Sequence, residues 1–124
     1  MKDEGSGMTR DLRERTKQFA LRIIRLCSSL PTTPAAQVIG RQVLRSGTSV
    51  GAHYREAHRA RSTAEFISKI EGGLQELEET NYWLELLSES KLLPPRRLVD
   101  LHNESEQLTA IFTSVAKNAK KRRS

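Results

Sequence analysis

The first regular pattern of apolar positions runs from residue 9 to about residue 29. The core-type residues recur at spacings of three, four or seven with one polar position in the series: Leu12, Thr16, Phe19, Ile23 and Leu26. This is the period of one face of an α-helix, so the pattern predicts a helix over 9–29. Pro31 then disfavours helical backbone at the residue before it. Thr33 and Pro34 suit the N-cap and first position of a second helix.

Small residues characterise the second predicted helix, over 34–61. Its three glycines are seven and four residues apart, at Gly40, Gly47 and Gly51. Each costs roughly 1 kcal/mol against alanine in an isolated helix, so packing against another helix has to compensate for them. Such a face allows a neighbouring helix to approach closely. The alternative is that one of these glycines ends the helix.

Two stripes run along this same predicted helix, and one bundle core can use only one of them fully. The stripes are Ile39-Ser46-Ser49-His53-Ala60 and Val43-Gly47-Val50-Tyr54-Ala57. The unused stripe favours a further partner for the helix, such as a second copy of the chain. The alternative is a single wide face buried inside a monomer.

A capping box marks the start of the third helix, because the Ser62 hydroxyl can accept from the backbone amide of Glu65 while that carboxylate reaches back. This helix is predicted over 62–90, and an unbroken alternation of three and four between apolar positions predicts a fourth over 95–118. Four amphipathic helices with short links predict one all-α domain over 9–118, an antiparallel up-and-down four-helix bundle. We expect residues 1–8 to be disordered and 119–124 to form a basic C-terminal tail.

Composition and charge narrow the function classes. The chain has 124 residues and a formal net charge of +6, so anionic partners are plausible. The charge is uneven, because 62–90 holds seven acids and one base while 34–61 holds five bases and one acid. Six aromatic residues are too few for the stacking platforms of RRM or OB folds. A lone cysteine and the lack of a secretory signal or a membrane-spanning stretch favour a soluble, cytoplasmic protein.

Motifs of catalysis are missing from the sequence, so we expect no enzyme activity, cofactor or metal. No Glu-x-x-His pair, phosphate-binding glycine loop or nucleophile elbow occurs. His53 and Glu56 form a single reversed pair, and Glu56 has arginines nearby that favour an ion pair over a metal role. Cys27 follows Leu26 on the apolar side of its helix, which suits a small core residue better than a nucleophile.

Basic side chains are the candidate nucleic-acid contacts. They are four arginines of the second helix and a run at the C-terminus: Arg41, Arg45, Arg55, Arg59, Lys117, Lys120, Lys121, Arg122 and Arg123. Lys and Arg bind phosphates, and such contacts favour salt-sensitive binding with little sequence preference. Two alternatives stay open. The arginines can pair with the acidic third helix or stay solvated, and the C-terminal run can simply complement a helix dipole.

The second and third helices resemble a known family. The resemblance is carried by Leu30-Pro31, by the segment 39–57 and by Arg61-Ser62-x-x-Glu65-Phe66, and it spans residues 12 to 115. The chain is similar to the bacterial four-helix-bundle proteins encoded in 23S ribosomal RNA intervening sequences. That family includes the accessory variability protein of diversity-generating retroelements.

The resemblance implies a non-catalytic bundle that assembles into a homopentameric ring with a basic surface. In the retroelement branch the ring binds a reverse transcriptase and nucleic acid. The matching residues imply architectural roles: close helix approach at Ser46 and Ser49, and a polar link between Arg45 and Glu56. His53 departs from the asparagine expected at its position. The other matches are Arg61, Ser62, Glu65 and Phe66.

These observations lead to a first hypothesis of a non-catalytic, oligomeric accessory protein that binds nucleic acid, with a reverse transcriptase as a further candidate partner. The competing hypothesis is a protein–protein scaffold whose basic surface docks on an acidic partner. A third is an intervening-sequence protein without a defined activity, which would only self-assemble.

Overall fold

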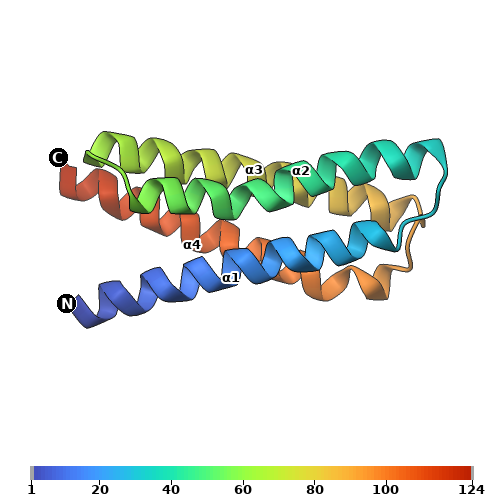
Figure 1. Cartoon of the computed structure of the whole chain (residues 1–124), viewed down its shortest axis with the longest axis horizontal. Helices are drawn as coiled ribbons and strands as arrows, with labels where there is room; N and C mark the ends of the chain where they lie inside the picture. Colours follow the sequence, from blue (N-terminus) through green and yellow to red (C-terminus); the bar gives the residue numbers. More distant parts are fainter. Residues whose placement is uncertain (1, 124) are drawn as a thin grey trace.

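Four α-helices make up the chain in the computed structural model, which describes the backbone of residues 2–123 and the side chains of residues 11–123 (Figure 1). They are α1 (Lys2–Ser28), α2 (Pro34–His58), α3 (Thr63–Glu89) and α4 (Val99–Arg123), and a short 3-10 helix η1 (Pro95–Arg97) precedes the last. No strand occurs over residues 2–123. The helices form a four-helix bundle, with consecutive helices side by side and linked at alternate ends (Figure 1).

The helix starts at the two predicted capping sites follow local chemistry. The Thr33 hydroxyl accepts from the amide of Ala36 at 3.3 Å, and the Ser62 hydroxyl accepts from the amide of Glu65 at 3.0 Å. Each contact satisfies one backbone donor that a helix N-terminus leaves without an intrahelical partner. The predicted starts at 34 and 62 are therefore correct to within one residue.

Helix ends and the first and last helices differ more from the prediction. α2 ends at His58 rather than 61, and α4 begins at Val99 because Pro95–Arg97 first forms η1. Residues 119–123 continue α4 instead of forming a tail, and Ala119 is fully buried. α1 begins at Lys2, inside the segment 1–8 that the sequence predicts to be disordered. Residues 1 and 124 lie outside the described residues.

The glycines of α2 lie inside the helix, so the alternative that one of them ends it is wrong. A Cβ at Gly47 would come within 2.8 Å of Ile23 Cγ1, which shows how closely α1 crosses α2 there. A Cβ at Gly73 would meet the fully buried ring of Phe112 at 2.7 Å. Glycine is required at these positions because the neighbouring helix occupies the space of a side chain.

The two stripes of α2 differ in how far the chain itself covers them. The stripe containing Val43 and Val50 is fully buried in the core. The other stripe faces α3, where Ser46 is fully buried and the His53 ring lies 2.9 Å from a Cβ built at Gly72. The other four residues of this stripe are only half-buried, at Ile39, Ser49, His53 and Ala60. α3 therefore covers part of the second stripe, and a further partner for it stays a prediction.

The contact between the first and last helices is the smallest of the four and contains an ion pair. α1 and α4 share fewer contacts than the three consecutive pairs do. Across this seam the Arg15 guanidinium donates from Nε and Nη2 to the two Glu104 carboxylate oxygens, at 3.1 and 2.8 Å. Such a two-pronged pair fixes the relative register of the helices.

The described helices are too short or too polar to span a lipid bilayer.

Candidate nucleic-acid interface

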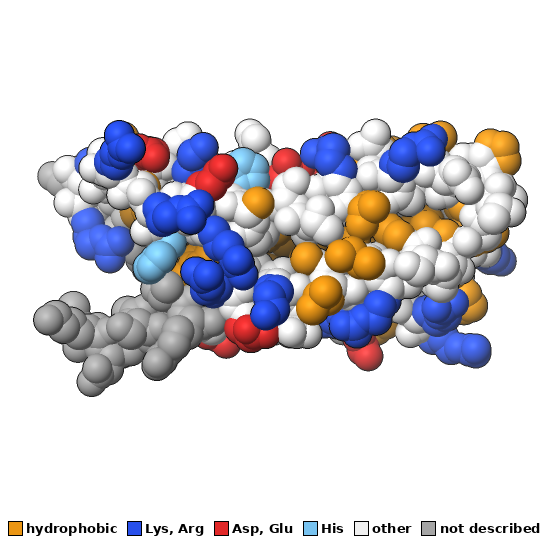
Figure 2. Space-filling model, in the orientation of Figure 1, with side chains coloured by type: hydrophobic (Ala, Val, Ile, Leu, Met, Phe, Trp, Pro, Cys, Tyr) orange, Lys and Arg blue, Asp and Glu red, His pale blue; other side chains and the backbone are white. Residues whose placement is uncertain are grey.

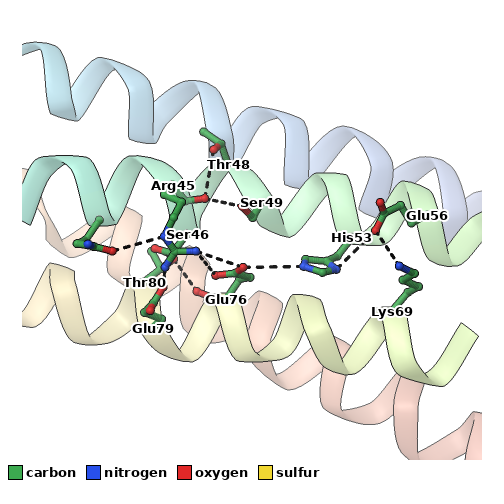
Figure 3. A network of polar contacts seen from close by, with 11 residues as sticks. Arg45, Ser46, Thr48, Ser49, His53, Glu56, Lys69, Glu76, Glu79 and Thr80 are labelled. Atoms are coloured by element: carbon green, nitrogen blue, oxygen red, sulfur yellow. Dashed lines mark hydrogen bonds and ion pairs between the residues drawn. The ribbon is translucent and has the colours of Figure 1, made fainter. Parts of the chain in front are cut away.

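Among the residues that the structure describes, Arg45 is the one predicted phosphate contact of α2 that pairs with acidic side chains. Its guanidinium donates to Glu76 at 3.2 Å and also contacts Glu79, both on α3 (Figure 3). Two carboxylates therefore compete with any phosphate for this side chain. The prediction that the acidic helix takes up part of the basic charge of α2 is correct at Arg45.

The expected link between Arg45 and Glu56 is wrong. Eleven residues separate them, which is about 16 Å along a helix and too far for the two side chains to meet. Glu56 instead lies 3.5 Å from Lys69 Nζ on α3 (Figure 3). His53 stands between the two carboxylates, with Nδ1 3.8 Å from Glu56 and Nε2 3.9 Å from Glu76.

Of the two serines that the resemblance assigns to close helix approach, Ser46 has that role. Ser46 and Thr80 are both fully buried, and their hydroxyl oxygens lie 2.8 Å apart across α2 and α3 (Figure 3). The half-buried Ser49 donates to the carbonyl of Arg45 in its own helix at 2.6 Å. Small side chains that satisfy their own hydroxyls allow helices to approach without leaving an unpaired polar group.

The other three arginines of 34–61 predicted as contacts have no ion pair with any described residue. Arg41 and Arg55 lie on α2, and Arg59 directly follows it. Arg41 and Arg59 are exposed. Arg55 is half-buried and lines a groove of about 380 Å³ between α1 and α2, together with Lys17. Lys17 was not among the predicted contacts, because only the packing of α1 on α2 brings it to the same groove. These arginines are available to an anion.

The basic run at the C-terminus forms the last turns of α4. Lys120 donates to Glu71 of α3 at 2.6 Å, so that cation already has an acidic partner. The remaining four side chains are exposed and have no partner within residues 11–123: Lys117, Lys121, Arg122 and Arg123. Their position complements the negative end of the helix dipole, which accounts for part of the run.

One end of the bundle collects most of these cations. The C-terminal ends of α2 and α4 and the start of α3 meet there, close to both chain ends (Figure 1). We call this surface the basic pole and define it by six exposed side chains: Arg59, Arg61, Lys117, Lys121, Arg122 and Arg123. Figure 2 shows several Lys and Arg side chains on this half of the face in view, and others on the opposite half. Arg61 matches the family pattern but was not among the predicted nucleic-acid contacts.

Chemistry other than charge is sparse on the described residues. No group of three or more His, Cys, Asp or Glu side chains could hold a metal ion among residues 11–123. The Cys27 thiol is half-buried and donates to the carbonyl of Gly40 at 3.5 Å. Burial raises the pKa of Cys27, which keeps it protonated and suits a packing role.

Comparisons with known proteins agree with the helical architecture. The family model for the 23S rRNA-intervening sequence protein matches residues 9–114. The fold is similar to a crystal structure of a protein of unknown function from the S23 ribosomal protein family of Bacteroides thetaiotaomicron, with a TM-score of 0.82 and 36% identity. That match covers 88% of this chain and 97% of the other. No curated protein matches the chain. With its four-helix fold and this match, the chain belongs to the family of 23S rRNA-intervening sequence proteins.

Proposed function

We propose that this chain is a non-catalytic, oligomeric accessory protein of the cytoplasm that binds nucleic acid at its basic pole. The observation that carries the proposal is the set of six exposed cations at one end of the bundle without an acidic partner among the described residues. Each is free to neutralise a phosphate. The family name suggests a structured ribosomal RNA segment as the first ligand to try.

Such binding depends on phosphate charge and little on base sequence. Each neutralised phosphate releases condensed counterions, so the logarithm of the binding constant falls by about 0.9 per contact for each tenfold rise in salt on a duplex. Six contacts would weaken binding by roughly a thousandfold between about 50 and 200 mM salt. The paired side chains Arg45 and Lys120 should contribute less, because a phosphate must first displace a carboxylate.

The test is a salt titration of binding to structured RNA and to duplex DNA. The double variant Lys117→Gln/Lys121→Gln removes two exposed charges of the basic pole, so we expect a salt slope smaller by about 1.8. The matched control, Arg25→Gln/Arg96→Gln, removes two exposed charges at the opposite end of the bundle. Equal losses in both variants, or binding that does not respond to salt, would contradict a site at the basic pole.

Self-assembly into a ring of five antiparallel up-and-down bundles is the second part of the proposal, and the resemblance to the family suggests it. Two exposed stripes support a head-to-tail contact between copies. The outer face of α2 has Arg41 and Arg55. That of α3 has Glu78, Tyr82, Glu85 and Glu89, and its three acids are unpaired among the described residues. A contact between two different faces of neighbouring copies produces a closed ring when the rotation from one copy to the next closes on itself.

Native mass spectrometry tests the ring. We expect a pentamer for the unmodified chain, and we expect the charge reversal Glu85→Lys/Glu89→Lys to shift the mass toward the monomer. A monomer at micromolar concentration for the unmodified chain would contradict the ring.

An acidic protein surface is the alternative ligand, because the basic pole offers charge rather than base recognition. A reverse transcriptase of a diversity-generating retroelement is the partner that the resemblance suggests. Purification of the chain from its native host, with and without nuclease, separates the two. A partner protein that stays bound after nuclease treatment favours the scaffold, and a partner lost with the nucleic acid favours direct binding.

A further inference from the structure

An apolar pocket of about 510 Å³ lies next to the basic pole, and all four helices contribute to it. Its walls include the ring of Phe66 at the start of α3 and the ring of Tyr54 on α2. Ile111 and Val115 of α4 complete this part of the wall. Pockets between the helices of a bundle are common sites for ligands, and this volume is within the usual range for a small molecule.

The remaining lining of the pocket is polar. Ser114, Asn118 and Arg122 follow one another at intervals of four along α4, so they share one face of that helix. His58 lines the pocket from the last turn of α2. Arg122 is exposed and has no partner within the described residues, and no Asp or Glu belongs to the described lining. The pocket thus offers apolar walls, an amide and a hydroxyl, and a positive charge.

We propose that this pocket holds one unpaired nucleobase of a bound strand, with the adjoining phosphate on Arg122 and His58. The inference rests on the proposed function, since Arg122 belongs to both the pocket and the basic pole. A nucleobase has apolar faces that pack on aromatic and aliphatic side chains, and an edge that exchanges hydrogen bonds with an amide such as that of Asn118. A purely aliphatic anion would match the apolar walls and Arg122 but would make no use of the hydrogen-bonding groups of Ser114 and Asn118.

The proposal predicts a preference for bulged over fully paired nucleic acid. Contact of one base with an aromatic side chain strengthens binding by roughly tenfold. We therefore expect an RNA duplex with one bulged 2-aminopurine to bind roughly tenfold more tightly than the same duplex fully paired. The fluorescence of the 2-aminopurine should change as the base moves from solvent into the pocket.

Variants of α4 separate the pocket from the charged surface around it. Ser114→Leu places a larger side chain in the pocket at an exposed position, so the preference for the bulge should fall to about one while duplex binding persists. Thr113→Leu is the matched control, because Thr113 is exposed on the same helix but does not line the pocket. Ala110→Leu is a second filling variant, and circular dichroism checks that each variant remains folded.

A charge comparison completes the test. Arg122→Gln should reduce the affinity for the bulged duplex more than Arg123→Gln does, because Arg123 lies outside this pocket. No preference for the bulge, or an equal preference in the Ser114→Leu variant, would overturn the pocket proposal while leaving duplex binding intact. Failure to bind either duplex at low salt would instead overturn the proposed function itself.

Discussion

The buried hydroxyl pair between α2 and α3 leads to a prediction about stability. Thr80 Oγ1 lies 2.8 Å from Ser46 Oγ and 2.7 Å from the carbonyl oxygen of Glu76. A hydroxyl has one proton, and a carbonyl can only accept, so Thr80 donates to Glu76 and accepts from Ser46. Thr80→Val keeps the shape of the side chain but leaves the Ser46 hydroxyl without its partner on α3.

The expected loss follows from the burial of both groups, which are fully inaccessible to solvent. A buried polar group left unsatisfied costs about 1–3 kcal/mol. Ser46 can turn toward the carbonyl one turn back in its own helix, as serine often does, which places the cost near the lower end of that range. We therefore expect Thr80→Val to lower the free energy of unfolding by about 1–2 kcal/mol, or Tm by about 4–8 °C.

Urea unfolding followed by circular dichroism, at one fixed protomer concentration, measures this change. Thr80→Ser is the control that keeps the hydroxyl. In the Ser46→Ala/Thr80→Val double variant both polar groups are gone, so it should cost less than the sum of the single variants by about 1 kcal/mol. Strictly additive losses would show that the two hydroxyls do not stabilise one another, and would refute the argument.

Three further predictions test the packing and the titratable groups. In urea unfolding, Gly73→Ala should lower the stability of the chain by about 1–2 kcal/mol, because the new methyl group meets Phe112. This loss outweighs the better helix propensity of alanine. Adding Phe112→Leu should partly relieve it. Burial raises the pKa of Cys27, so iodoacetamide should modify it more slowly than a free thiol at pH 8, with a rate that rises at higher pH and upon unfolding. Glu104→Gln weakens the pair with Arg15, and should lower the free energy of unfolding by about 0.5–1 kcal/mol at low salt and by less at high salt.

Helix starts were predictable from sequence because capping is local. Thr33 and Ser62 each satisfy a backbone amide three residues further on, and that pattern is visible in the residues themselves. Helix ends gave weaker signals. The run after Ala119 has no proline or glycine to stop a helix, so α4 continues through the basic residues that the pattern assigned to a tail.

The sequence predicts that the basic second helix pairs with the acidic third helix, but not which residues form the pairs. The excess of acids over 62–90 indicates that basic residues of 34–61 will find partners there. Which ones do so depends on the register of α2 against α3, and that register pairs Arg45 with Glu76 and Glu79 while Glu56 pairs with Lys69. The same register buries Ser46 of the second stripe of α2 and leaves its other residues half-buried.

Both chain ends lie at the same end of the bundle as the link between α2 and α3 (Figure 1). An affinity tag or fluorescent protein fused at either terminus would therefore sit beside the basic pole and compete with its ligand. The opposite end offers the links 29–33 and 90–94, which lie a full helix length away. A dye attached at one of those links would report binding without blocking it.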